Sequence, residues 1–532
     1  MRISAAMTML SMIGLLCLAG SHAQENCTVT LKLIDSATGR ELSGLVSVAD
    51  ADGNRVAVRE LLSRGLGLDE TLPIGRWSVL AKSTTLQLPK KKLIIAALSG
   101  LETEQNQITI DLTTQDRANV TLLLKRFYDA SLRGYRSANT HLHLQKISRA
   151  ECDRYLLEVP QADGLDLLFL SYLERAGADR EYTSNRYTDG DLASLTKISG
   201  VTFGNGEEHR HNFTGFGEGY GHVMLLNIQK LIQPVSIGQG IMKRGTDGIP
   251  LQRGIDTARR DDATIIWCHN SWGREAFPNF LTGRVNAQNI FDGGPHGSYK
   301  DSFYRYLNAG LQVPFSTGTD WFMYDFSRAY AEMTGEVSVK SWLKALAAGR
   351  TYITNGPLLE FSADGKKIGE TIELEAPGKT EVKARAVGRV DFGRIELVRN
   401  GRVVARSPSR RVGRHYEADL SMAVEQPGPG WLALRTPPPP VKDDPLLQQP
   451  VSKNEFGHDL FAHTSAIYVE VGGRSHFDPS VASRWLAAMK NNHDFIAEKA
   501  NFSDDQERQR VLDVYRDGIA EMTKKLKSNA SR

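Results

Sequence analysis

The sequence of 532 residues predicts an α/β protein in which a central α/β barrel is flanked by β-sandwich domains and followed by a C-terminal helical tail. Three observations predict this class. Short alternating apolar runs fill the first part of the chain, buried runs alternate with helical segments in the middle, and the end has apolar residues at helical spacing. We therefore expect five segments, namely 1–23, 24–128, 129–350, 351–475 and 476–532.

Residues 1–23 predict a secretory signal peptide. Arg2 precedes an apolar stretch from Met7 to Leu18, and Ser21-His22-Ala23 forms a small-x-small cleavage site. This stretch is shorter than the roughly 20 apolar residues of a membrane-spanning helix, and no later stretch is long and apolar enough either. We expect an exported protein, periplasmic or extracellular, without a membrane span after the signal is removed.

Composition indicates an ordinary globular protein. The chain is 41% hydrophobic and 24% charged with a net charge of +3, so nothing in it favours nucleic acid or an anionic membrane as a partner. Of the four cysteines, Cys17 leaves with the signal peptide. The remaining Cys27, Cys152 and Cys268 allow at most one disulfide, so the core must supply the stability.

Residues 24–128 and 351–475 predict β structure. Runs such as CTVTLKLID and NVTLLLKRF, separated by Gly, Asp and Asn turns, indicate a small antiparallel sandwich in the first segment. Runs such as LLEFSADG and SAIYVEV indicate a second β-domain, interrupted by Pro437 to Pro440. In the tail, 476–532, helical spacing predicts two amphipathic helices that pack on the body.

Residues 129–350 have a different pattern of apolar residues. The apolar runs LDLLFL, VTFGN, HVMLLNI, TIIWCH and QVPFSTG alternate with helical segments such as GIDTARRDD. This alternation implies parallel strands joined by crossovers, and hence an α/β barrel or a doubly wound sheet.

The pair His141-x-His143 stands where one of these strands should end. Side chains two residues apart on a strand share a face, so both imidazoles can reach one ion. Further polar residues stand at the edges of later apolar runs, where an α/β barrel presents its catalytic groups. They are Glu207, Glu208, His222, His269 and Asp320.

The order of these motifs resembles the PHP metallohydrolases, whose fold is a distorted seven-stranded (β/α) barrel. The shared features are His-x-His, then Gly-x-Glu followed by Gly-His, then His after an apolar strand, then Gly-(Ser/Thr)-Asp. The segment GRTYITNGPLLEFSADGKKIGETI, residues 349–372, resembles the CehA/McbA branch of that family. The resemblance covers about residues 130–475, and implies a distorted (β/α)7 PHP-like barrel.

Three departures from the family pattern fall on the ligands of one metal of three. Ser148, Ser171-Tyr172-Leu173 and Phe322 stand where the family has acidic or histidine ligands. The resemblance therefore implies a centre reduced to two metals. The implied ligands are His141, His143, Glu208 and Asp320 for one ion, and Glu208, as a bridge, with His222 and His269 for the other. Glu207 is the alternative bridge.

The chemistry implied is metal-assisted hydrolysis. Two divalent ions about 3.5 to 4 Å apart activate a water and polarise the bond under attack. Histidine ligands favour Zn, and mixed sites also take Mn or Fe. Glu208 and Asp320 are the candidate catalytic residues, with Asp320 accepting the proton of the water. The family implies an ester, carbamate or phosphoester bond in a small-molecule or carbohydrate-like substrate. The alternative is a noncatalytic glycan- or ligand-binding module on a degenerate barrel.

Five residues near the expected ligands are candidate substrate contacts: His209, His211, Trp272, Arg274 and Trp321. The two histidines fit an exposed loop as well, and the two tryptophans fit packing as well. Cys268 adjoins His269, and strand alternation should turn its thiol to the opposite face, where we expect it buried and inert. His463 is expected to be a packed structural histidine.

Overall fold

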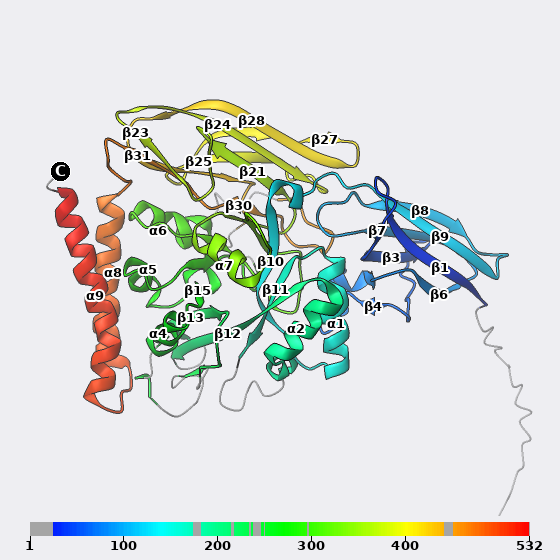
Figure 1. Cartoon of the computed structure of the whole chain (residues 1–532), viewed down its shortest axis with the longest axis horizontal. Helices are drawn as coiled ribbons and strands as arrows, with labels where there is room; N and C mark the ends of the chain where they lie inside the picture. Colours follow the sequence, from blue (N-terminus) through cyan, green and yellow to red (C-terminus); the bar gives the residue numbers. More distant parts are fainter. Residues whose placement is uncertain are drawn as a thin grey trace, which may run out of the picture.

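The computed structural model describes residues 25–173, 182–213, 217–232, 236–237, 246–248, 251–294, 297–440 and 451–530. The expected signal peptide lies outside these residues. The protein is a strand-rich mixed α/β structure with several sheets (Figure 1). Within the described part, none of the helices has the length and apolar character needed to cross a membrane. The segment boundaries expected from the sequence stay predictions.

The N-terminal sheets fit the expected β-sandwich. One sheet has the order β2-β1-β6 with β9 also beside β1, and the other has the order β4-β5-β3-β7-β8. The strands are β1 (Asn26–Asp35), β2 (Glu41–Leu42), β3 (Gly44–Asp50), β4 (Leu62–Ser63), β5 (Ser78–Leu80), β6 (Thr84–Pro89), β7 (Lys92–Leu98), β8 (Asn106–Asp111) and β9 (Arg117–Leu124). Alternate residues of β1, from Cys27 to Leu33, are buried in a hydrophobic core between these sheets. The pairing of β1 with β9 is parallel, unlike the antiparallel pairing expected.

The body contains two groups of parallel strands. Strand β10 (Tyr135–His143) pairs in parallel with β11 (Leu167–Tyr172), and β11 with β12 (Thr202–Phe213). A second parallel group joins β15 (Thr264–Trp267), β16 (Ala287–Asn289) and β17 (Phe315–Ser316). On its other side β10 pairs with β18 (Asp320–Trp321), so the end of β10 has neighbours on both sides.

Strand β13 (Gly217–Leu226) departs from the expected parallel arrangement. It runs antiparallel to both β12 and β15. A parallel neighbour needs a crossover of a dozen or more residues, and the sequence between β12 and β13 is far too short for one. The all-parallel expectation is wrong at this strand, and the seven-stranded (β/α) barrel stays a prediction.

Helices and short strands complete the body. The helices are α1 (Arg149–Ala162), α2 (Asp189–Ser199), α4 (Leu251–Arg260), α5 (Ala276–Leu281), α6 (Arg305–Asn308) and α7 (Val339–Ala347), and the strands are β14 (Ser236–Ile237), β19 (Arg328–Glu332) and β20 (Thr351–Thr354). Ser148 begins α1 through a capping box with Glu151, which satisfies two backbone N–H groups.

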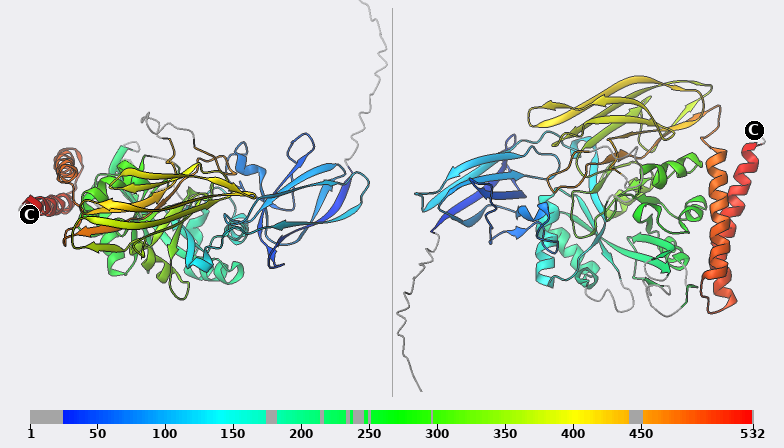
Figure 2. Two further views of the ribbon diagram at one scale, coloured as in Figure 1. Left: turned by 90° about the horizontal axis from the view of Figure 1, so that it is seen from above. Right: turned by 180° about the vertical axis from the view of Figure 1, so that it is seen from behind.

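The C-terminal β structure forms a layer over the body (Figure 2). One sheet has the order β22-β21-β24-β28-β27, formed by β21 (Leu358–Ala363), β22 (Lys366–Lys367), β24 (Gly378–Gly388), β27 (Arg410–Val412) and β28 (His415–Gln426). The other strands are β23 (Thr371–Leu374), β25 (Arg394–Arg399), β26 (Arg402–Pro408), β29 (Gly430–Arg435), β30 (Ala462–Thr464) and β31 (Ile467–Val471). Because β30 pairs with β20, this layer is continuous with the body.

Two helices end the chain, as expected from the spacing. Helix α8 (Pro479–Lys499) and helix α9 (Asp505–Ala530) lie side by side at the end of the molecule opposite the N-terminal sheets (Figures 1 and 2). Val511, Tyr515 and Met522 are buried in the core of the body. A Cβ at Gly518 would lie 2.8 Å from Pro278 Cβ, so glycine permits the close contact of α9 with α5.

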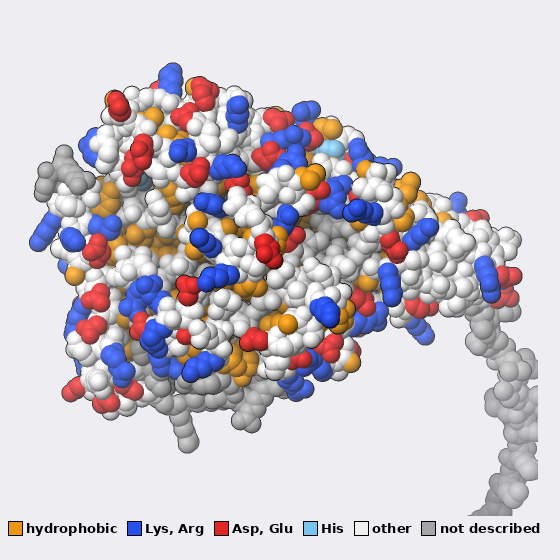
Figure 3. Space-filling view, viewed as in Figure 1, with side chains coloured by type: hydrophobic (Ala, Val, Ile, Leu, Met, Phe, Trp, Pro, Cys, Tyr) orange, Lys and Arg blue, Asp and Glu red, His pale blue; other side chains and the backbone are white. Residues whose placement is uncertain are grey.

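The surface carries both signs of charge. In Figure 3, Lys and Arg side chains are interspersed with Asp and Glu side chains over the visible face. Cys27, Cys152 and Cys268 are all buried and free, so the disulfide that the sequence permits does not form among the described residues.

His463 is a buried residue at the junction of the body and the C-terminal β structure. Its Nδ1 donates to the Thr464 carbonyl (2.7 Å), and its Nε2 accepts from the Tyr304 hydroxyl (2.8 Å). Arg435 donates to the same hydroxyl (2.9 Å). Burial, and then the charge of Arg435, lower the pKa of His463 to about 3. The imidazole is therefore neutral and structural.

This histidine should make the folded protein sensitive to acid. Its pKa rises to the ordinary value of about 6.5 on unfolding, so the unfolded chain binds one more proton between about pH 6.5 and 3. Over that window the stability falls with decreasing pH by about 1.4 kcal/mol per unit from this group. We expect urea unfolding of His463→Gln at pH 6 and pH 4 to show a shallower fall than wild type. Equal falls in the two proteins would contradict this account.

Candidate metal centre

Five elements bring the six candidate ligands together in the interior. The ligands come from the end of β10, from β12 and β13, from the turn after β15, and from β18: His141, His143, Glu208, His222, His269 and Asp320. Only His269 has a substantially exposed side chain, at 19%. Glu208 and His222 lie within the antiparallel pair β12 and β13, and this pair brings them beside the ends of β10 and β15 and the start of β18.

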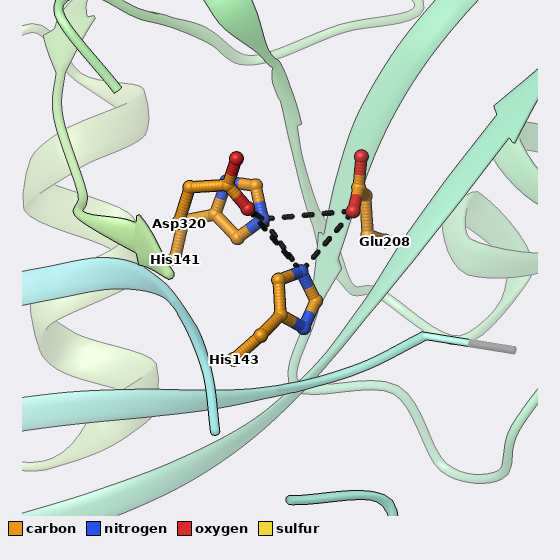
Figure 4. Close-up of side chains that lie close together, drawn as sticks. All are labelled: His141, His143, Glu208 and Asp320. Atoms are coloured by element: carbon orange, nitrogen blue, oxygen red, sulfur yellow. Dashed lines mark hydrogen bonds and ion pairs between the residues drawn. The ribbon is translucent and has the colours of Figure 1, made fainter. Parts of the chain in front are cut away.

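The first group consists of His141, His143, Glu208 and Asp320 (Figure 4). His143 Nε2 lies 3.1 Å from Glu208 Oε2, and His141 Nε2 lies 3.4 Å from Asp320 Oδ1. The two Nε2 atoms are 2.9 Å apart. One ligand atom from each residue lies within 4.8 Å of the others, which is close enough for all four to surround one ion.

The Nδ1 atoms of both histidines are engaged elsewhere. His141 Nδ1 donates to Asp292 Oδ2 (2.8 Å), and His143 Nδ1 donates to the Ser171 carbonyl (2.9 Å). Because these bonds fix the tautomers, the Nε2 lone pairs face each other. A proton or a metal ion between them removes the repulsion.

The second group consists of Glu208, His222 and His269. Glu208 Oε1 lies 3.0 Å from His222 Nδ1 and 3.5 Å from His269 Nε2. His222 Nε2 donates to Asn212 Oδ1 (2.6 Å), so its Nδ1 carries a lone pair toward the carboxylate. Glu208 thus presents Oε2 to the first group and Oε1 to the second.

Several buried atoms of the centre lack a hydrogen-bond partner among the described residues. They are Glu208 Oε1, His222 Nδ1, Asp320 Oδ1 and Asp292 Oδ1. Buried polar atoms are nearly always paired, because an unpaired one loses its hydration without compensation. All four are acceptors or lone-pair donors, so a cation suits them and another hydrogen-bond acceptor does not. The residues present therefore fit divalent metal ions.

The protonation of the centre follows from burial and charge. Burial opposes the charge of Glu208, but Arg210 and the neighbouring histidines hold the pKa of its carboxyl well below the ordinary value. Burial lowers the pKa of His222 to about 3, which leaves a neutral ligand at neutral pH. Burial also opposes the charged form of His269, yet Glu208 and the nearby Asp292 and Asp320 raise its pKa to about 8. A metal ion must therefore displace a proton from His269 near neutrality.

The backbone around the centre is unusual. His269 (φ 54°), Asn270 (φ 58°), Asp320 (φ 59°) and Phe322 (φ 52°) are non-glycine residues in the left-handed region. Such conformations persist only where the surroundings impose them, and they gather at functional sites. Their concentration at two ligand-bearing turns supports a functional role for this cluster.

Asp292 is a member of the cluster that sequence reasoning missed. Besides His141, it lies near His269, with Oδ2 at 3.8 Å from His269 Nδ1, and it accepts from Asn289 Nδ2 (3.0 Å). A carboxylate behind a metal-binding imidazole fixes the orientation of the ring and its tautomer. The signal was present in the sequence, because Asp292 directly follows the apolar run in QNIFDG.

Cys268 is buried, as expected, and burial raises the pKa of its thiol. Its position was predicted wrongly, because the thiol lies beside His141 and Asp292 and not on the face away from the centre. Strand β15 ends at Trp267 and the chain turns at His269, so the strand alternation that the prediction used does not extend through Cys268.

Alternation along β12 separates its polar residues. Glu208, Arg210 and Asn212 face the centre, with Arg210 Nη1 at 3.5 Å from Glu208 Oε1. Glu207 lies on the other face, where it accepts from His209 Nδ1 (2.8 Å) and from the Ile232 N–H (2.7 Å). Glu208, and not Glu207, therefore lies between the two groups.

The other predicted substrate contacts separate into two sets. His209 contacts Glu207, while His211 bonds to Asp247 (2.8 Å), and both are buried on the face of β12 opposite Glu208, neither in an exposed loop nor at the centre. Arg274 bonds to Asn492 of α8 (2.8 Å) and lies over the Phe495 ring, so the structure directs it to the helical tail. These three side chains are therefore directed away from the two ligand groups, and their part as substrate contacts stays a prediction.

The two tryptophans lie beside the centre. The Trp272 ring is 4.6 Å from that of His222, and the Trp321 ring is 5.1 Å from that of His143. Tyr182, which the sequence did not single out, lies 5.1 Å from Trp321 and 5.9 Å from His143. Tyr182 and Trp321 form one wall next to His143, whereas Trp272 lies beside His222.

The positions at which the resemblance to PHP proteins indicates lost third-metal ligands have other contacts here. Ser148 caps α1, and Ser171 Oγ accepts from the Leu142 N–H (3.1 Å). Leu173 and Phe322 are buried apolar residues. None of these side chains offers a strong metal ligand.

No protein-family model matches the sequence, and no curated protein matches it. A solved structure from Bacteroides vulgatus ATCC 8482, a two-domain protein containing a predicted PHP-like metal-dependent phosphoesterase, is similar with a TM-score of 0.33 and 13% sequence identity. The match covers 57% of this chain and 92% of that chain. A similarity at this level does not establish a shared fold or family. Membership of the PHP family and of its CehA/McbA branch is therefore a proposal.

Replacing Asp292 should separate the effect of its hydrogen-bond acceptor from the effect of its negative charge. Asp292→Ala removes the acceptor of the His141 Nδ1–H and should weaken metal binding by roughly 10- to 100-fold. Asp292→Asn keeps an acceptor oxygen and should recover part of that affinity. Calorimetric titration of the metal-free protein with Mn²⁺ measures both effects, with Asp35→Asn, a buried carboxylate at the end of β1 in the N-terminal sheets, as control. Wild-type affinity in Asp292→Ala would contradict the positioning role.

Proposed function

We propose that the protein is a dinuclear metal-dependent hydrolase of the PHP type. The observation that carries the proposal is the arrangement of Glu208, whose Oε2 lies 3.1 Å from His143 and whose Oε1 lies 3.0 Å from His222. A bridging carboxylate needs this division of its two oxygens, and a stabilising ion pair with one partner does not.

The residues of the chain would divide the work as follows. When bound, two divalent ions would lower the pKa of a water toward neutrality and polarise the bond under attack. Glu208 would bridge the ions, and Asp320 would take the proton of the water and pass it to the leaving group. Arg210, 8% exposed and beside Glu208, would add a fixed positive charge for an anionic oxygen of the substrate.

The substrate and setting are further parts of the proposal. We propose an ester, carbamate or phosphoester bond in a small-molecule or carbohydrate-like substrate, with the wall formed by Tyr182 and Trp321 as the contact for its apolar part. Zn is the first candidate ion because most ligands are imidazoles, and Mn or Fe also fit the mixed donor set. Export rests on the N-terminal segment of the sequence.

The number of metals tests the centre itself. We expect about two divalent ions per chain by elemental analysis after mild dialysis. Glu208→Gln should lose both, because the carboxylate serves both groups, and His222→Ala should lose one. Glu207→Gln is the matched control on the opposite face of β12, and it should keep both ions. A wild-type value near zero or three would contradict the two-metal centre.

Activity separates the hydrolase from the noncatalytic binding module. The metal-loaded protein should hydrolyse an activated ester, carbamate or phosphodiester, with a rate that rises with pH as bound water deprotonates near neutrality. Chelation should abolish the rate, and added Zn or Mn should restore it. His141→Ala and Asp320→Asn should lose activity with nearly unchanged circular dichroism, because the large core holds the fold. If no activated substrate turns over with any metal, the binding module becomes the better account.

A further inference from the structure

The N-terminal sheets contact the turn that carries Asp320. The contact is made by the loop that follows β4, and β4 lies at the side of the body, next to α1 (Figure 1). Two residues of this loop make the contact. Gly67 lies against Phe322, and Arg64 bonds to Met323, two and three residues after Asp320. More than 250 positions separate the two segments in the sequence, so this contact is a tertiary feature of the fold.

Arg64 is fully buried at the base of the contact. Its Nε and Nη2 donate to both oxygens of Asp163, at 3.1 and 2.5 Å, which is a bidentate pair. Its Nη1 donates to the backbone carbonyl of Met323. A buried guanidinium with this many hydrogen bonds has little freedom, so the position of the Met323 carbonyl is tied to the body and to β4 together.

Gly67 covers the Phe322 ring, which is 2% exposed. A Cβ built on Gly67 would lie 2.1 Å from the Phe322 ring, and Gly67 has a φ of +80°. The loop backbone therefore approaches the ring more closely than any side chain would allow. The backbone of Gly67 therefore packs directly against the Phe322 ring.

Residues 320–323, which make these contacts, form a turn with a strained backbone that carries the ligand Asp320. Asp320 and Phe322 both have positive φ, and the Phe322 N–H donates to the His143 carbonyl at 2.9 Å. The Met323 N–H donates to the Tyr155 hydroxyl at 2.9 Å. Conformations of this kind persist only where the surroundings over-determine them, and Arg64 and Gly67 contact this segment in addition to the body residues His143 and Tyr155.

We propose that the N-terminal sheets are a positioning element of the metal centre, in which Arg64 and Gly67 hold the Asp320 carboxylate toward His141 and His143. This inference rests on the proposed two-metal centre. Asp320 belongs to the first ligand group only, and no residue of its turn belongs to the Glu208, His222 and His269 group. Disturbing the contact should therefore weaken one ion selectively.

Gly67→Ala is the test variant, and Gly53→Ala is its matched control. Both glycines belong to the N-terminal sheets and have nearly the same φ, +80° and +83°, but a Cβ at Gly53 meets nothing within 4 Å. Both variants therefore carry the same backbone strain, and only one displaces Phe322. We expect calorimetric titration of the metal-free full-length protein with Mn²⁺ to show one binding step weakened about 10-fold in Gly67→Ala. Both steps should be unchanged in Gly53→Ala.

The identity of the weakened step provides a second readout. His222→Ala should retain only the step of the first group, and adding Gly67→Ala to it should weaken that remaining step. Arg64→Lys, which keeps a cation for Asp163 but loses the Nη1 donor to the Met323 carbonyl, should weaken the same step. Thermal unfolding of each variant reports whether the fold persists.

Two outcomes would overturn the inference. One is wild-type affinity for both ions in Gly67→Ala. The other is that Gly53→Ala weakens both binding steps as much as Gly67→Ala does, which would indicate general backbone strain. Failure of the proposed function looks different, because the wild-type protein itself would then bind no metal.

Discussion

The buried charge of Glu208 is the constraint on which the centre depends. A carboxylate without solvent contact is unfavourable unless cations or hydrogen-bond donors surround it. Arg210 lies 3.5 Å from Glu208 Oε1, and His143, His222 and His269 turn ring nitrogens toward the carboxylate, so protons or metal ions held between them would balance its charge. These residues come from the separate strands β10, β12 and β13 and from the turn after β15, so the strands must close around one point. The antiparallel insertion of β13 between β12 and β15 serves this requirement directly, because it delivers His222 opposite Arg210.

Sequence reasoning succeeded where one physical rule decided the outcome. Alternation of apolar residues predicted the N-terminal sheets, and helical spacing predicted α8 and α9. The rule that polar residues at strand ends converge brought out His141, His143 and Asp320, which do lie together. His222 lies in the middle of β13 and not at its end, although it does join Glu208 and His269. These signals are local, so a single sequence carries them.

It failed where a local rule was extended past its range. Alternation was assumed through Cys268, although the strand had ended, and the run containing His209 and His211 was read as a loop although it is a strand. The direction of Arg274 depends on α8, which lies more than 200 positions later, and no local pattern specifies such a contact. Asp292 was missed for a different reason: it directly follows an apolar run, as the predicted ligands do, but the expected motif order had no place for it.

The C-terminal helices contact residues of the body next to β12 and next to the turn after β15. Asn501, between α8 and α9, exchanges backbone and side-chain hydrogen bonds with Asp247, which in turn holds His211, and Asn492 holds Arg274 next to the Trp272 turn. The C-terminal helices thus hold side chains on the face of β12 opposite Glu208 and beside the Trp272 turn. Removing α8 and α9 would take these partners away from Asp247 and Arg274 together, so the two helices belong to the packing of the body and are not an independent appendage.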